Sequence, residues 1–88
     1  VKSHSVRIVL IQSPAGFQQD LERVGDFESG MISTASDIKG IAGPRILVDF
    51  VTSTITALNA SDETVHTAPL PKNAEEISAA IATAVSRL

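Results

Sequence analysis

The chain has 88 residues, a formal net charge of −3, 43% hydrophobic residues and no cysteine. This length predicts one domain, which we assign to residues 6–88 behind a short tail at residues 1–5. The missing cysteine excludes disulfides, thiolate metal sites and a cysteine nucleophile. The seven basic residues are scattered along the chain, whereas nucleic-acid binding needs clustered positive charge, so we expect no nucleic-acid partner.

The hydrophobic content of the chain bears on its location and on the make-up of its core. No stretch approaches the roughly 18–20 consecutive apolar residues of a membrane span, so we expect no membrane partner and a cytoplasmic protein. Only three residues are aromatic, so the core must consist mainly of aliphatic side chains. The high apolar content of so small a chain has two explanations, which are a fully packed core and a face covered by a partner.

The first half of the chain predicts a strand, a helix and a second strand. Residues 6–11 (VRIVLI) are β-branched and apolar on both faces, which is typical of a strand in the middle of a covered sheet. Ser13 suits the N-cap of the next helix, Pro14 its first position and Gly25 its end. The following segments predict, in order, a turn, a weak strand and a connection with one helical turn: residues 26–30, 31–35 and 36–43.

The stretch from residue 43 to residue 59 decides the fold class and supports two interpretations. Its polar residues recur at spacings of four and three, which predicts a helix that begins at Pro44. Its content of Val, Ile and Thr favours a strand instead. On that second interpretation, residues 46–56 form a strand and residues 36–42 form the helix before it.

The last part of the chain predicts a strand and a helix. Residues 63–68 are expected to form a strand with Val65 pointing inward and His66 outward, ended by the prolines that follow. Asn73 suits a helix N-cap, and Glu76 completes a pattern like a capping box. The order β-α-β-α-β-α predicts an α/β (or α+β) fold, a small sandwich of three to four strands with about three helices.

One loop and one helix face are the candidate functional surfaces. In α/β sheets, ligands bind beyond the carboxyl ends of strands, where helix N-termini point N–H groups at anions. The loop after the first strand is therefore a candidate anion site, formed by Ser13, Ala15 and Gly16. The final helix carries an apolar, alanine-rich stripe that we interpret as a candidate interface, formed by Ile77, Ala80, Ile81, Ala84, Val85 and Leu88.

No motif assigns an enzyme class or a family. The two histidines, His4 and His66, lack the spacing of a metal pair, and no carboxylates have the spacing of a calcium loop, so we expect no metal and no cofactor. The leading hypothesis is a non-catalytic module that forms a homo-oligomer or binds a protein partner in a larger assembly. The alternative is a small regulatory domain that binds an anion, and a third is a small enzyme acting through Ser13 or His66.

Overall fold

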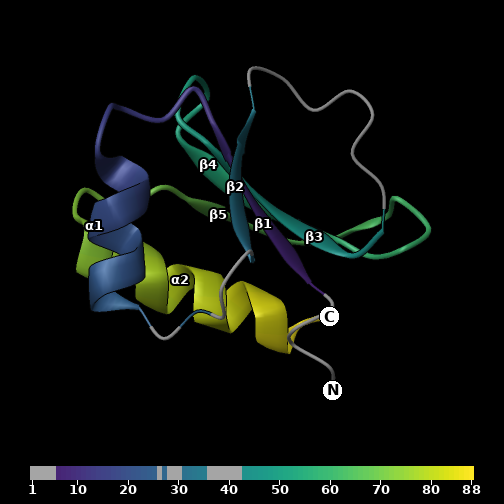
Figure 1. The fold of residues 1–88 in the computed structure, drawn as a ribbon. Coiled ribbons are helices and arrows are strands. Elements are labelled where there is room, and N and C mark those ends of the chain that lie inside the picture. The colour runs from purple at the N-terminus through teal and green to yellow at the C-terminus, as the bar shows by residue number, and fades with distance from the viewer. Residues whose placement is uncertain (1–5, 26, 28–30, 36–42) are drawn as a thin grey trace.

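The computed structural model in Figure 1 describes residues 6–25, 27, 31–35 and 43–88. They form one five-stranded sheet and two helices. The elements, in chain order, are β1 (Arg7–Ile11), α1 (Phe17–Val24), β2 (Ile32–Ala35), β3 (Arg45–Asp49), β4 (Thr54–Leu58), β5 (Thr64–Pro69) and α2 (Ala74–Ser86). The order β-α-β-β-β-β-α confirms a small α/β domain. The expected order β-α-β-α-β-α is wrong, and the described residues form two helices where about three were expected. The predicted tail at residues 1–5 lies outside the described residues, as does the predicted turn at residues 26–30 apart from Phe27. The connection predicted at residues 36–43 also lies outside them apart from Gly43, and so does the helix that the second interpretation places at residues 36–42.

The sheet is mixed, with strand order β2-β1-β3-β4-β5. β1 pairs in parallel with both β2 and β3, whereas β3, β4 and β5 form an antiparallel meander. β1 lies between β2 and β3, and the side chains of residues 8–11 are buried alternately on the two faces of the sheet. The prediction of a strand in the middle of a covered sheet is therefore confirmed.

The predicted helix from Pro44 is wrong, because residues 45–58 form the β3–β4 hairpin. Ile55 and Ala57 are fully buried, while Thr54, Thr56 and Leu58 are half-buried, which is the alternation of a strand. The alternative prediction of a single strand over residues 46–56 is closer to the structure, but it does not include the turn between β3 and β4. The helical spacing of polar residues arose because two strand segments and a polar turn happen to place them three and four residues apart.

Asp49 organises that turn. Its Oδ1 accepts hydrogen bonds from the backbone N–H groups of Val51 at 2.8 Å and Thr52 at 3.3 Å. An aspartate that bonds to the backbone two residues ahead favours a turn over a continuing helix or strand. Ser53 completes the turn with a positive φ of 57°.

Both helices pack on the same face of the sheet, as Figure 1 shows, and leave the other face without a described helix. The main core consists of side chains from this face of the sheet and from the two helices: Val6, Ile8, Leu10, Leu21, Ile32, Ile46, Val48, Ile55, Ala57, Ile77, Ile81 and Ala84. A smaller cluster of buried side chains lies on the other face: Val9, Ile11 and Leu47. The core is thus aliphatic, and the apolar content is used on both faces of the sheet.

The second half of the chain confirms one prediction and contradicts another. Asn73 caps α2 as predicted, since its Oδ1 accepts a hydrogen bond from the backbone N–H of Glu76 at 2.8 Å. The predicted orientation of β5 is wrong, because His66 is half-buried opposite Ala57 on the helix face and Val65 is 40% exposed. β5 alternates as a strand does, but its half-buried side chains are His66 and Ala68, so the phase of the alternation is the opposite of the predicted one.

A buried arginine lies at the start of β3, on the face without described helices. The Arg45 side chain is only 9% exposed and forms an ion pair with Asp62, with 2.9 Å between Nη2 and Oδ1. Its Nη1 donates a hydrogen bond to the carbonyl oxygen of Gly43 at 2.7 Å. Asp62 has a positive φ of 65° in the β4–β5 turn, so the ion pair joins this turn to the sheet.

Candidate functional site

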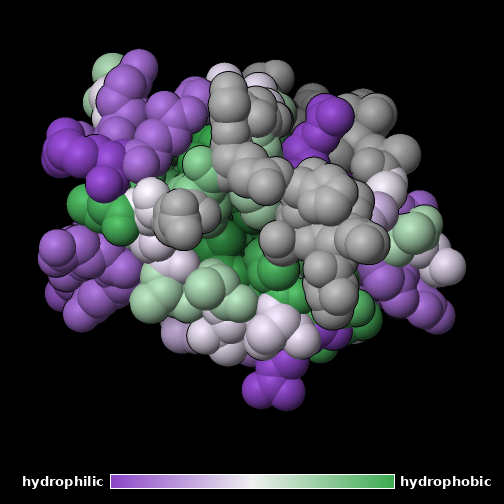
Figure 2. All heavy atoms as spheres, turned by 60° about the horizontal axis from the view of Figure 1, so that its bottom comes forward, coloured by the Kyte–Doolittle hydropathy of each residue, from purple (hydrophilic) through white to green (hydrophobic). Residues whose placement is uncertain are grey.

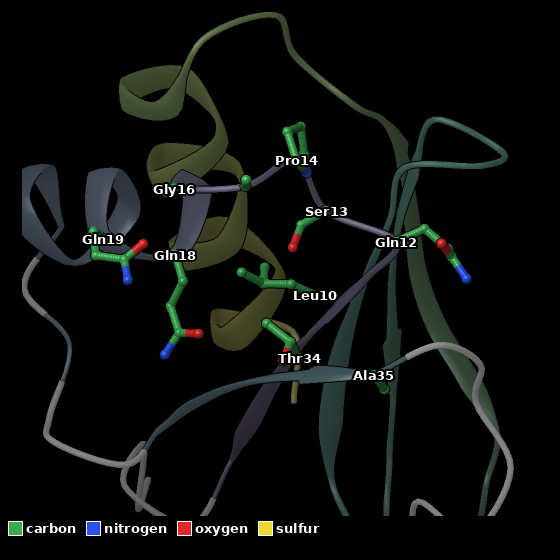
Figure 3. Close-up of a pocket in the computed structure, with 10 residues that line it drawn as sticks. Leu10, Gln12, Ser13, Pro14, Gly16, Gln18, Gln19, Thr34 and Ala35 are labelled. Carbon is green, nitrogen blue, oxygen red and sulfur yellow. The ribbon is translucent and has the colours of Figure 1, made fainter.

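A pocket of about 540 Å³ opens where the parallel strands β1 and β2 end and α1 begins. Figure 3 shows it between the loop after β1, the first turn of α1 and the end of β2. All three residues of the predicted anion site, Ser13, Ala15 and Gly16, line this pocket. The location follows from the topology, because the carboxyl ends of adjacent parallel strands meet at one edge of the sheet.

The loop reaches α1 through a tight turn. The backbone N–H of Phe17 donates to the carbonyl oxygen of Pro14 at 3.1 Å, and Gly16 has φ 83° and ψ −7°. These angles at the third of four residues define a type II turn, a position that requires positive φ and hence favours glycine. Gly16 is therefore the N-cap of α1, and the predicted roles of Ser13 as N-cap and Pro14 as first helical residue are wrong. Gly25 ends the helix as predicted.

The N-terminus of α1 has no side-chain cap. Gly16 has no side chain to cap the helix, and the structure gives no cap hydrogen bond there. The Phe17 N–H is used in the turn, but those of Gln18 and Gln19 have no hydrogen bond to any residue that the structure describes. Unpaired N–H groups at a helix N-terminus favour an anion or an acceptor oxygen. A ligand that displaces water there has to accept hydrogen bonds from these N–H groups in place of the water.

Hydroxyl and amide side chains surround these N–H groups. Figure 3 shows the Ser13 hydroxyl directed toward the space between Leu10 and Gln18, while the Gln12 side chain points away from it. Thr34 lies at the end of β2, opposite the loop. The hydroxyls of Ser13 and Thr34 form no hydrogen bond with the described part of the chain. The pocket can therefore offer donors and acceptors from three separate elements.

None of the described residues that line the pocket has an ionisable side chain. Two charged side chains of α1 form an ion pair with each other, with 3.1 Å between Arg23 Nη2 and Asp20 Oδ1. The third, Glu22, accepts a hydrogen bond from Gln18 Nε2 at 3.4 Å. With no imidazole or carboxylate in the lining, no described group there is placed to activate the Ser13 hydroxyl as a nucleophile.

The sequence did not point to Gln18, Gln19 and Thr34. Thr34 lies in a segment predicted only as a weak strand, and its proximity to the loop depends on the β1–β2 pairing, which sets Leu10 opposite Thr34. A helix that begins at Pro14, as predicted, would have both glutamines in its second turn, whereas α1 begins at Phe17 and has them in its first. The sequence Pro14-Ala15-Gly16 was the available signal, since proline followed by glycine marks turns.

The residues of the candidate interface lie mainly inside the molecule. Ile77, Ile81 and Ala84 are buried against the sheet, and the other three are half-buried against the same core: Ala80, Val85 and Leu88. Figure 2 brings the lower side of Figure 1 forward, where α2 runs, and shows hydrophobic atoms in the middle of this face between hydrophilic ends. The stripe therefore has an intramolecular role, and an interface with another chain at this stripe stays a prediction.

The histidines do not gather into a site. His66 lies on β5, the opposite edge of the sheet from β2, and is not part of the pocket lining. His4 lies outside the described residues. Within the described ranges, no three His, Asp or Glu side chains come together as ligands for a metal would.

The comparisons with known proteins add no relative. No protein-family model, no curated protein and no solved structure gives a significant match to this chain. Neither described helix is long and apolar enough to cross a membrane. The class that the fold defines is a small α/β domain with a mixed sheet and both described helices on one face.

Proposed function

We propose that this protein is a small regulatory domain that binds an anionic ligand in the pocket after β1. The observation that carries the proposal is the coincidence of the pocket with the uncapped N-terminus of α1. An anion there accepts hydrogen bonds from the N–H groups of Gln18 and Gln19 and gains from the helix dipole. The Ser13 hydroxyl supplies a further donor.

The backbone of the loop gives this proposal additional support. Gln12 has a positive φ of 56°, a conformation that costs roughly 1–2 kcal/mol for a residue with a side chain. Gly16 has positive φ four residues later. Unfavourable backbone conformations are often found at binding sites, where the surrounding structure maintains them. Here they turn the chain so that Ser13 faces the pocket and α1 points its N-terminus at it.

The proposal is tested by scanning calorimetry with acetate, sulfate and phosphate at constant ionic strength. A ligand that binds only the folded state at ten times its dissociation constant raises the free energy of unfolding by about 1.4 kcal/mol. We expect at least one of these anions to raise Tm at millimolar concentration. The Ser13→Ala variant should lose part of that shift, and the Ser61→Ala variant, altered in the exposed β4–β5 turn, should keep it. If no anion raises Tm, the proposal is wrong.

We propose self-association as a second function, because three residues of the α2 stripe have part of their surface exposed to solvent. Ala80, Val85 and Leu88 are half-buried, and the face in Figure 2 shows apolar atoms at its centre. A second copy of the chain that covers this face would remove that apolar surface from water. Such a copy needs no change in the packing of the fully buried residues of α2.

Sedimentation velocity at tens of micromolar tests this second proposal. We expect a species larger than the monomer, and we expect Val85→Lys to shift it toward monomer. Thr83→Lys is the matched control, because Thr83 is exposed on the same helix. A wild-type protein that sediments as a monomer over this range would exclude the self-association proposal.

A further inference from the structure

We infer that a second copy of the chain pairs with the free edge of β5, so that two antiparallel β5 strands join the sheets of a dimer. The inference rests on the proposed self-association and names the edge through which it occurs. β5 is the last strand of the sheet, on the far side from β2 (Figure 1). It pairs with β4 along one edge, and no other described strand pairs along its second edge.

The second edge of β5 is accessible to a partner strand. Val65 is 40% exposed, and Thr67 and Pro69 are exposed as well. No charged residue lies between Thr64 and Leu70. The register shift of the β4–β5 pairing lies at the Thr64 end and leaves the rest of the strand regular. Many edge strands carry lysine or another charge that opposes pairing with a second chain, and β5 carries none.

The backbone of β5 is complementary to a second β5. The N–H of Leu70 donates to the carbonyl oxygen of Ser53 at 2.9 Å, so the backbone groups of Leu70 face β4. Because these groups alternate along a strand, those of Thr67 and Pro69 face the open edge. In an antiparallel pair centred on Thr67, the two Thr67 residues exchange both of their backbone hydrogen bonds. The same register sets the Pro69 carbonyl oxygen, which needs no N–H beside it, opposite the N–H of Val65 in the other copy.

The charges on either side of β5 match this register. Asp62 and Glu63 precede the strand, Lys72 follows it, and all three are exposed. Asp62 and Lys72 are each five residues from Thr67, so the antiparallel pair sets the acidic end of each β5 opposite the basic end of the other. Opposite charges that face each other across an antiparallel pair stabilise it. A twofold axis repeats this match, which identifies the partner as a second copy of the chain.

The same twofold axis brings the two α2 helices together. An axis through an antiparallel strand pair is perpendicular to the sheet, so the helices of both copies lie on one face. α2 packs against β3, β4 and β5, whereas α1 packs against β2. The two α2 helices therefore flank the axis, where one partner can cover both the β5 edge and exposed surface of α2. Each copy has one β5 edge, so assembly through it ends at a dimer.

Sedimentation velocity of two lysine variants tests the edge. Thr67→Lys sets two like charges opposite each other at the axis, and we expect it to weaken dimerisation by about fivefold or more. Thr52→Lys makes the same change at an exposed position of the β3–β4 turn and should dimerise as the wild type does. If the wild type dimerises and Thr67→Lys does so equally well, or if both variants lose affinity equally, the edge inference is wrong and self-association stands. A monomeric wild type would refute both.

Amide exchange followed by NMR gives a second measurement, on the wild-type protein. The N–H of Thr67 faces the open edge of the monomer, whereas that of Ala68 faces β4. We expect the Thr67 amide to exchange fast when dilute and at least about fivefold more slowly once the dimer forms, while the Ala68 amide is protected at every concentration. Equally fast exchange of the Thr67 amide in monomer and dimer would overturn the inference.

Discussion

Replacing Ile81 by alanine tests whether the apolar stripe of α2 belongs to the core of the monomer. Ile81 is fully buried in the main cluster between α2 and the sheet. The substitution removes three carbon atoms, which at about 0.8 kcal/mol per buried methylene corresponds to roughly 2.5 kcal/mol of lost transfer free energy. Incomplete collapse around the cavity raises the expected loss to about 3–4 kcal/mol.

This loss is large for a chain of 88 residues, whose total stability is expected to be roughly 4–13 kcal/mol. It corresponds to a decrease in Tm of at least about 12 °C. The assay is urea unfolding followed by far-UV circular dichroism, since the chain has no Trp or Tyr for fluorescence. Thr83→Ala, at an exposed position of the same helix, should change the stability by less than about 0.5 kcal/mol.

Protein concentration distinguishes the two roles of the stripe. A core residue changes the unfolding midpoint by the same amount at every concentration, whereas an interface residue has an effect that depends on assembly. The structure predicts a constant difference between wild type and Ile81→Ala over a hundredfold dilution. A loss below about 1 kcal/mol, or one that varies with dilution, would refute the placement of Ile81 in the monomer core.

Substitutions at three further positions test local features by the same denaturation assay. Gly16→Ala should cost about 1–2 kcal/mol through its positive φ alone, since no atom of the described residues lies within 4 Å of the added Cβ, and Gly16→Asn should cost less; equal stability of Gly16→Ala and wild type would contradict the turn. Asn73→Ala should cost about 1 kcal/mol by removing the cap of α2, and an unchanged midpoint would argue against that hydrogen bond. Asp62→Asn tolerates the same backbone angles but removes the charge beside Arg45, so we expect a loss of about 1–3 kcal/mol, and a neutral result would show that the ion pair contributes nothing.

Local signals in the sequence predicted the elements whose structure depends on neighbouring residues. The strand at residues 6–11, the end of α1 at Gly25 and the Asn73 cap were all predicted and are all present. The hairpin at residues 45–58 was not predicted, because its polar spacing fits a helix while its Val, Ile and Thr content favours a strand. Pairing with β1 and β5 decides between the two. Tertiary contacts therefore decided the one segment on which the fold class depended.

The candidate site was only partly predicted, because it too depends on contacts between segments that are distant in the sequence. Ser13, Ala15 and Gly16 were found by the rule that places ligands after strands, and that rule uses only the order of elements. Thr34 joins them through strand pairing between segments separated by a helix, which a single sequence does not reveal. The start of α1 was placed too early, since the turn that ends at Phe17 competes with a helix beginning at Pro14.

The sheet has a parallel part, β2-β1-β3, and an antiparallel part, β3-β4-β5, and this division affects the order in which the strands fold. The meander β3–β5 joins strands that follow one another in the chain, whereas β1 must find β3 after a long intervening segment. Contacts between near neighbours close early and distant ones late, so the meander should form first and β1 should enter last, between β2 and β3. Pulse-labelled amide exchange during refolding should show the amides of Ile55 and Ala57 protected before those of β1, and the reverse order would contradict this sequence of events.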